Sequence, residues 1–182
     1  MTQKNIDNDK ELRQGCLKND ATCQKKLYDK YAGIMYTICL RYGQHQEEAK
    51  DFLQDGFVKV FKSIGSFSFK GSFEGWMKRI FVNTALEEIR KKGRLVLQEE
   101  PDTSHLIEEE WTVSGNLTMN HILAEIQKLP DGYRTIFNLY VIDGYQHNEI
   151  AQLLGITDST SKTQLRKARL ALQEKLQHLR SN

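Results

Sequence analysis

Residues 145–169 read Tyr-Gln-His-Asn-Glu-Ile-Ala-Gln-Leu-Leu-Gly-Ile-Thr-Asp-Ser-Thr-Ser-Lys-Thr-Gln-Leu-Arg-Lys-Ala-Arg. The apolar residues before Gly155 have the spacing of a short helix, and glycine most easily adopts the left-handed turn that ends a helix. A second helical pattern starts after this turn. Two helices joined in this way are typical of a helix-turn-helix, whose second helix enters the major groove of DNA. A structural corner of two helices that binds nothing has the same outline, and this alternative remains open.

The second helix of the pair has an apolar side and a polar, basic side. Its apolar residues recur at helical spacing and are Leu165, Ala168, Leu172, Leu176 and Leu179. Asp158 or Ser159 can cap its first turn. A purely structural helix does not need polar first turns, so we expect them to be exposed and to contact DNA, Lys162 and Gln164 at bases and the later basic residues at phosphates. The candidate contact residues are Ser159, Thr160, Ser161, Lys162, Gln164, Arg166, Lys167 and Arg169.

Charge is strongly segregated along the chain of 182 residues, although its net charge is only +2. Residues 95–117 contain the acids Glu99, Glu100, Asp102, Glu108, Glu109 and Glu110 and no lysine or arginine. Basic residues cluster on both sides of this acidic stretch, at 59–70, 78–94 and 162–180. Basic clusters separated by an acidic strip favour a polyanionic partner more strongly than the net charge does.

The sequence offers no residues for a metal or cofactor site. The cysteines Cys16, Cys23 and Cys39 are odd in number and lack a CxxC spacing, which favours free thiols in a reducing cytoplasm. The histidines are scattered, and no nucleophile is paired with a base. We therefore expect no enzyme activity and no cofactor. No apolar stretch is long enough to span a membrane, and we expect a cytoplasmic protein.

Apolar spacing is helical almost everywhere, and no stretch alternates like a strand. The expected fold class is all-α, with two small helical domains joined by an acidic linker and a helix-turn-helix in the second domain. The expected domains are 1–94 and 118–182, with the linker at 95–117. The expected helices are 8–19, 22–42, 46–64, 73–92, 118–128, 131–142, 147–154 and 159–179.

The helix expected at 46–64 has an apolar stripe formed by Ala49, Leu53, Phe57, Val60 and Ile64. Asp51, Gln54 and Asp55 are three and four positions apart, so they share another face of the helix, which we expect to be exposed. A solvated face and a surface that contacts another protein explain these residues equally well.

The segment 62–75 is rich in glycine, serine and phenylalanine and contains Lys62 and Lys70. Aromatic side chains beside lysines suit extruded bases and the adjacent phosphates, although each of Phe67, Phe69 and Phe73 could instead fill the core. The helix that follows carries polar residues at helical spacing that form a candidate DNA-facing ridge. The candidate contact residues are Lys62, Phe67, Lys70, Trp76, Arg79, Asn83 and Arg90.

Taken together, these segments resemble those of bacterial sigma factors of the extracytoplasmic-function group. The resemblance covers residues 8–94 and 118–180 and depends on the order of four pieces. These are Leu27-Tyr28 with Tyr31; Asp51 to Phe57; Trp76 to Arg90; and Leu129-Pro130 through Glu149-Ile150-Ala151 to Ala168-Arg169.

The resemblance implies a partner for each segment. It implies that Asp51, Gln54 and Asp55 dock on core RNA polymerase, and that 62–75 and 76–92 bind the minus-ten element of promoter DNA. It assigns 159–169 to the minus-thirty-five element and the linker to the polymerase cleft. It also implies an anti-sigma factor as antagonist.

This chain departs from the family pattern at the start of the second helix of the pair. The usual glycine-threonine-valine-lysine-serine-arginine is here Ser159-Thr-Ser-Lys-Thr-Gln164, which leaves the minus-thirty-five base preference open. Three other functions remain as alternatives: a DNA-binding regulator that is not a polymerase subunit, a helical enzyme, and an interaction module that does not bind DNA. Co-purification with core polymerase separates the sigma factor from all three.

Overall fold

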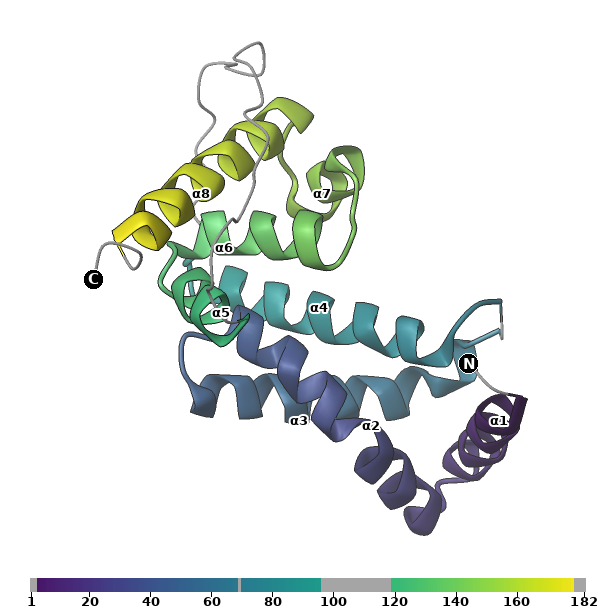
Figure 1. The fold of residues 1–182 in the computed structure, drawn as a ribbon. Helices are drawn as coiled ribbons and strands as arrows, with labels where there is room; N and C mark the ends of the chain where they lie inside the picture. Colours follow the sequence, from purple (N-terminus) through teal and green to yellow (C-terminus); the bar gives the residue numbers. More distant parts are fainter. Residues whose placement is uncertain (1–2, 69, 96–118, 179–182) are drawn as a thin grey trace. The chain divides into compact units, whose positions relative to one another are not determined.

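The computed structural model describes residues 3–68, 70–95 and 119–178, and all regular structure in these ranges is helical (Figure 1). The chain forms two compact units, residues 1–89 and 90–182. The prediction of an all-α fold with two helical units is therefore confirmed. None of the described helices is long and apolar enough to cross a membrane.

The helices of the first unit are α1 (Gln3–Leu17), α2 (Ala21–Tyr42), α3 (Gln46–Ser63), the 3-10 turn η1 (Ile64–Ser66) and α4 (Phe73–Lys91). Those of the second unit are α5 (Met119–Gln127), α6 (Asp131–Phe137), the π-helical turn η2 (Asn138–Ile142), α7 (His147–Leu154) and α8 (Asp158–His178). Most bounds lie within two residues of the expected ones. The first helix begins at Gln3, five residues before the expected residue 8. The prediction missed these opening turns because they are mostly polar and show no apolar stripe.

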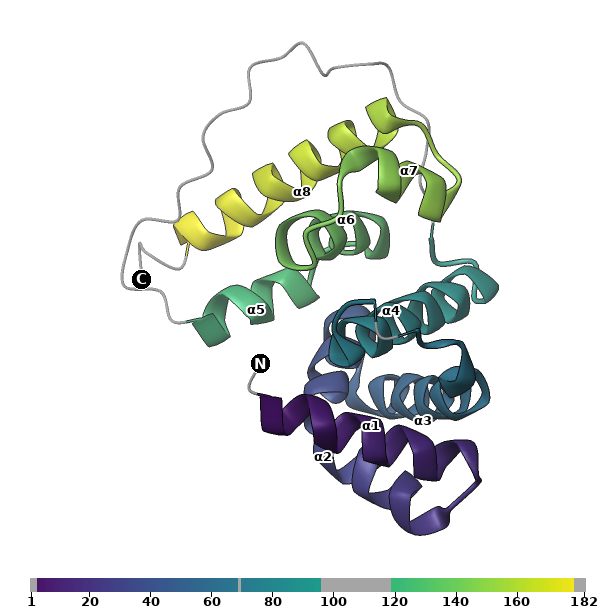
Figure 2. The same ribbon diagram turned by 90° about the vertical axis from the view of Figure 1, so that its right-hand side faces the viewer.

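In the first unit, α1 packs against α2, and α2 packs against α3 (Figure 2). The ring of Phe81 on α4 packs directly on Gly56 of α3, where an added Cβ would lie 2.3 Å from a ring carbon. Phe81 is fully buried, and its ring meets that of Phe57 edge-on at 5.2 Å. A residue without a side chain is therefore needed at position 56 to seat the aromatic core.

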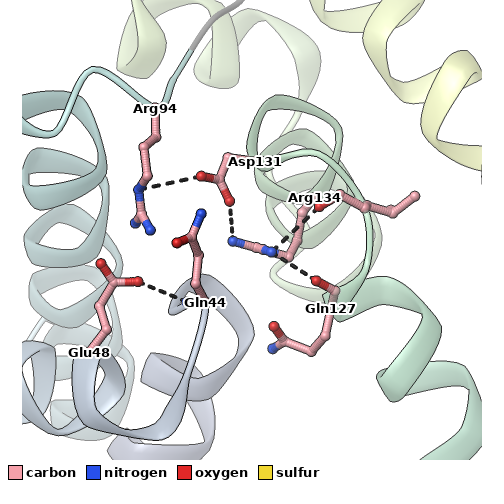
Figure 3. A network of polar contacts seen from close by, with 7 residues as sticks. Gln44, Glu48, Arg94, Gln127, Asp131 and Arg134 are labelled. Atoms are coloured by element: carbon pink, nitrogen blue, oxygen red, sulfur yellow. Dashed lines mark hydrogen bonds and ion pairs between the residues drawn. The ribbon is translucent and has the colours of Figure 1, made fainter.

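Side-chain caps fix the starts of α2 and α3. The carboxylate of Asp20 accepts backbone N–H bonds from Thr22 at 2.8 Å and Cys23 at 3.3 Å, which lowers the pKa of Asp20. His45 Nδ1 accepts from the N–H of Glu48, whose own carboxylate accepts from the N–H of Gln44 at 2.8 Å (Figure 3). These bonds satisfy N–H groups that the first turns of the helices leave without partners.

The corner between α5 and α6 in the second unit is held by a buried arginine. Arg134 donates to the carbonyl of Gln127 at 2.9 Å and forms an ion pair with Asp131 (Figure 3). The other carboxylate oxygen of Asp131 lies 3.4 Å from Nε of Arg94. Arg134 is only 3% exposed, and these partners offset the free-energy cost of removing its charge from water.

Candidate nucleic-acid interface

The pair α7 and α8 has the turn expected of a helix-turn-helix (green and yellow in Figure 1). At the start of α7, the N–H of Gln146 donates to the carboxylate of Glu149 at 2.8 Å. At its end, Gly155 has φ 70° and ψ 39°, the left-handed conformation predicted from the sequence. The N–H groups of Gly155 and Ile156 both donate to the carbonyl of Ala151, at 2.9 and 3.1 Å. These bonds end α7 and reverse the chain into α8.

The residue that caps α8 is Thr157, so the predicted cap at Asp158 or Ser159 is wrong. Thr157 Oγ1 accepts from the N–H of Thr160 at 3.1 Å, and the carbonyl of Thr157 accepts from the N–H of Ser161. The helix begins one residue earlier than expected, which puts Asp158 in the first turn, where its charge is favourable.

Most polar residues in the first turns of α8 are buried, although we expected them to be exposed. Thr160, Ser161, Thr163 and Gln164 are between 0% and 3% exposed, whereas Lys162 is exposed. For two of them the reason is a hydrogen bond: Thr160 pairs with the hydroxyl of Thr157 at 2.8 Å, and Ser161 lies 2.8 Å from Nδ1 of His147. The inner face of α8 is therefore partly polar.

The remaining predicted contact residues of α8 are half-buried, namely Ser159, Arg166, Lys167 and Arg169. Tyr140 helps to place two side chains near this part of the helix. Its ring stacks on His147 with 4.3 Å between centroids, and the guanidinium of Arg169 lies 6.0 Å from its centroid. Lys162 is the one predicted contact residue of α8 that is exposed.

In the first unit, a pocket of about 260 Å³ opens between the segment after α3 and the start of α4. This volume lies just below the ~300 Å³ at which pockets for drug-sized ligands begin, so it suits one small ring system. The lining residues are Ser66, Phe67, Ser68, Lys70, Gly71, Ser72, Gly75, Trp76 and Arg79. Phe69 lies outside the described residues.

Two aromatic side chains, Phe67 and Trp76, line the pocket, and Phe73 packs against both of them. Trp76 and Phe73 are stacked with centroids 5.5 Å apart and planes 16° from parallel. Phe67 lies 5.1 Å from Phe73 and 5.5 Å from Trp76. Phe67 and Phe73 are buried, so they do fill the core, whereas Trp76 is partly exposed and offers its ring to the pocket.

The predicted basic ridge is present on α4. Arg79, Asn83 and Arg90 are exposed, and at about 100° per residue they fall within ~40° of one another around the helix. Lys70, which lines the pocket, is exposed on the segment before α4, and Lys62 is exposed in the last turn of α3. The pocket is therefore bordered by cations, as a site for a base and its adjoining phosphates requires.

The predicted acidic face is present on α3, where Asp51, Gln54 and Asp55 are all exposed. Val58, which was not predicted as part of this face, is 44% exposed and lies on it seven residues after Asp51. Tyr28 of α2 is also exposed, and its ring lies 4.6 Å from that of Phe57. The signal for Val58 was its position off the apolar stripe of α3, and its exposure adds apolar area to the face that carries the acids.

Two family profiles match the two units. Sigma-70 region 2 matches residues 27–95, and Sigma-70 region 4 matches residues 120–172. A helical unit with an aromatic pocket, followed by a helix-turn-helix unit, is thus the arrangement of a sigma factor, a non-enzymatic subunit for transcription initiation.

Relatives narrow the class to one group. The ECF RNA polymerase sigma factor SigW of Bacillus subtilis is 31% identical in an alignment of 175 positions, gaps included, which covers 89% of this chain and 93% of SigW. The ECF RNA polymerase sigma-E factor of Escherichia coli is 27% identical in an alignment of 186 positions, gaps included, which covers 94% of this chain and 95% of that factor. This chain belongs to the extracytoplasmic-function sigma factors.

A solved structure agrees with this fold. The sigma factor RpoE of Bartonella quintana was solved in complex with the anti-sigma factor NepR. Its superposition on this chain has a TM-score of 0.54, and the two sequences are 22% identical. The likeness covers 84% of this chain and 96% of RpoE.

Proposed function

We propose that this sigma factor divides promoter recognition among three segments. Residues 1–94 bind core RNA polymerase and the minus-ten element, 95–117 form a linker, and 118–182 bind the minus-thirty-five element. The extents of the region 2 and region 4 matches, 27–95 and 120–172, support these boundaries.

The polymerase-binding surface in this proposal is the acidic face of α3. Asp51, Gln54 and Asp55 offer acceptors to a basic partner surface, and Val58, one turn after Gln54, supplies apolar area beside them. An interface with a desolvated apolar centre and a polar rim is what a stable protein contact needs. The exposure of these residues together on one helix is the observation that carries the assignment.

The minus-ten site is the aromatic pocket with the ridge on α4. Trp76 stacks on a base turned out of the duplex, and Lys62, Lys70 and Arg79 neutralise the phosphates beside it. Asn83 and Arg90 extend the contact along α4. Phe67 contributes by holding Trp76 in place, because it is buried against that ring.

The minus-thirty-five reader is α8, with Lys162 as the principal base contact. Its exposure in the first turns supports this role, whereas the burial of Gln164 favours a structural one for that glutamine. Arg166, Lys167 and Arg169 come later on the helix and hold phosphates, which position the helix without reading sequence.

The linker and the regulation of the protein complete the proposal. The acids of 95–117, all outside the described residues, suit a segment that lies beside nucleic acid without gripping it. We place the protein in the cytoplasm, where core polymerase is found. The complex of the Bartonella quintana relative with NepR supports an anti-sigma factor as a third partner.

One experiment tests the function and the polymerase surface together. Purified chain is mixed with core polymerase, isolated as a complex and assayed for start-site-specific transcription. The double variant Asp51→Lys/Asp55→Lys should lose complex formation while its circular dichroism stays unchanged. Glu11→Lys/Asp29→Lys carries the same charge change at exposed sites of α1 and α2 and should bind normally. Full polymerase affinity in the Asp51/Asp55 variant would overturn the surface assignment, and no complex with the parent chain would overturn the function.

A further inference from the structure

The N-terminal helix α1 is bonded directly to the segment that leads into the aromatic pocket. Arg13 Nε donates to the carbonyl of Ile64 at 3.1 Å, and Arg13 Nη2 donates to the carbonyl of Gly65 at 3.1 Å. These are consecutive carbonyls of η1, directly before the pocket residues Ser66 and Phe67. A guanidinium is the side chain that can bond two neighbouring acceptors at once in a fixed geometry.

A second connection runs from α1 to the other wall of the pocket. The carboxylate of Asp9, which is buried, accepts the hydroxyl of Tyr31 at 2.7 and 2.8 Å and pairs with Lys30 Nζ at 2.6 Å. Burial and the Asp9 hydrogen bond raise the pKa of Tyr31, so its hydroxyl remains a donor. The Tyr31 ring meets Phe73 edge-on at 6.0 Å, and Phe73 is stacked on Trp76.

We propose that α1 is a positioning element for the minus-ten pocket, with Arg13 fixing the wall formed by η1 and the Asp9–Tyr31 pair fixing the Phe73–Trp76 wall. The proposal rests on the pocket being the base-binding site argued above. The region 2 match begins at residue 27, so α1 lies outside it, and nothing in that match assigns α1 a role.

The physical reason for such an element is the composition of the segment it holds. Gly65 precedes the pocket residues, and Gly71 has φ +115°, a conformation that favours glycine. Glycine-rich backbone loses much conformational entropy when it is ordered. Hydrogen bonds from α1 order the root of the segment before DNA arrives, so less of this entropy is lost on binding.

The test measures how well the pocket recognises a base, and not only how tightly DNA binds. Holoenzyme is titrated with promoter DNA that is single-stranded at the minus-ten element, either intact or with an abasic site at one position at a time. Stacking of one base on an aromatic side chain changes affinity by roughly 5- to 150-fold. The parent should therefore show an intact-to-abasic affinity ratio in that range at one position.

Three variants of the α1 contacts separate positioning from general stability. Arg13→Ala and Tyr31→Phe should bring the ratio toward one, because the pocket no longer holds the base in register. Arg13→Lys keeps the charge but cannot bond both carbonyls as a fork, so it should restore the ratio only in part. Lys18→Ala removes an exposed charge directly after α1 and should leave the ratio unchanged.

Each outcome has one meaning. If the parent shows the ratio and Arg13→Ala and Tyr31→Phe keep it, the proposal for α1 is overturned and the pocket assignment stands. If the parent shows no difference between intact and abasic DNA at any position, the pocket assignment fails, and the role of α1 fails with it. Should Arg13→Ala not fold, Tyr31→Phe, which removes a single hydroxyl, decides between these outcomes.

Discussion

Replacing Gly56 by alanine should destabilise the first unit, although alanine favours helices. The new Cβ would lie 2.3, 2.4 and 2.8 Å from three ring carbons of Phe81. Contacts this short force one of the two groups to move. The ring is fully buried and packs edge-on against Phe57, so it cannot swing into solvent. The separation of α3 and α4 has to increase instead.

The expected size follows from two opposing terms. Overpacking a well-packed core costs about 1–3 kcal/mol. Replacing glycine by alanine in a helix interior returns about 0.5–1 kcal/mol. The net loss is therefore about 1 kcal/mol or somewhat more. For a unit of this size, a loss of ~1 kcal/mol lowers the melting temperature by roughly 4–8 °C.

A second glycine in the same unit provides a matched control. Gly33 is in the interior of α2, is exposed, and has no atom within 4 Å of the position of an added Cβ. Gly33→Ala should raise the free energy of unfolding by up to about 1 kcal/mol, since only the helix-propensity term applies. The two variants thus make the same chemical change with opposite expected signs.

Urea and thermal unfolding, followed by circular dichroism, measure both effects. Phe81→Leu in the Gly56→Ala background should recover part of the loss, because the smaller side chain makes room for the methyl group, and a double-mutant cycle isolates this coupling. Gly56→Ala protein that is as stable as Gly33→Ala protein would refute the close packing of the Phe81 ring on Gly56.

Four further predictions concern DNA binding, pH and thiol chemistry. Lys162→Ala should relax the preference at one minus-thirty-five base pair, with a loss of about 1–3 kcal/mol on the best site; Gln164→Ala should leave the preference unchanged, and the opposite pattern in binding selections would return the reading role to the glutamine. Lys62→Ala/Lys70→Ala should reduce the slope of log affinity against log salt by roughly 0.7 for each lost contact with single-stranded DNA; Lys25→Ala/Lys26→Ala is the control, and equal slopes would exclude Lys62 and Lys70 from the interface. The pKa of Asp20 is lowered in the folded chain by the N–H groups that it caps, so its charge stabilises the fold at neutral pH and this contribution is lost as the pH falls through and below 4; the difference in urea midpoint between parent and Asp20→Asn should shrink over that pH range, and a difference independent of pH would contradict the assignment. Burial raises the pKa of Cys16 to about 11 and that of Cys39 to about 12, so both thiols should react with a thiol reagent at neutral pH only after unfolding, and rapid labelling of either in the native chain would show that it is not buried.

The elements that the sequence predicted well are those with a strong local pattern. Gly155 predicted the end of α7, because few other residues adopt its left-handed conformation without strain. The spacing of Asp51, Gln54 and Asp55 predicted that they share an exposed face of α3. Both features depend on residues close together in the chain.

The polar residues at the start of α8 were misjudged for a different reason. Ser161 is buried because His147, on the preceding helix, supplies its hydrogen bond, and residue type alone predicts exposure for serine. The bonds from Arg13 to the backbone of η1 likewise join residues that are 51 and 52 positions apart in the chain. Contacts of this range cannot be recovered from local periodicity.

The π-helical turn η2 contains one residue more than an α-helical turn would, and this extra residue sets the direction of the helix that follows. Its hydrogen bond from the N–H of Asp143 to the carbonyl of Asn138 spans five residues, one more than an α-helical bond spans. Deleting one residue here would restore α-helical spacing and rotate everything that follows by about 100° around the helix axis. Chain length within η2 is therefore coupled to the direction in which α7 leaves α6. Sequence alignments of relatives across this turn should carry a one-residue gap wherever the surplus residue has been lost.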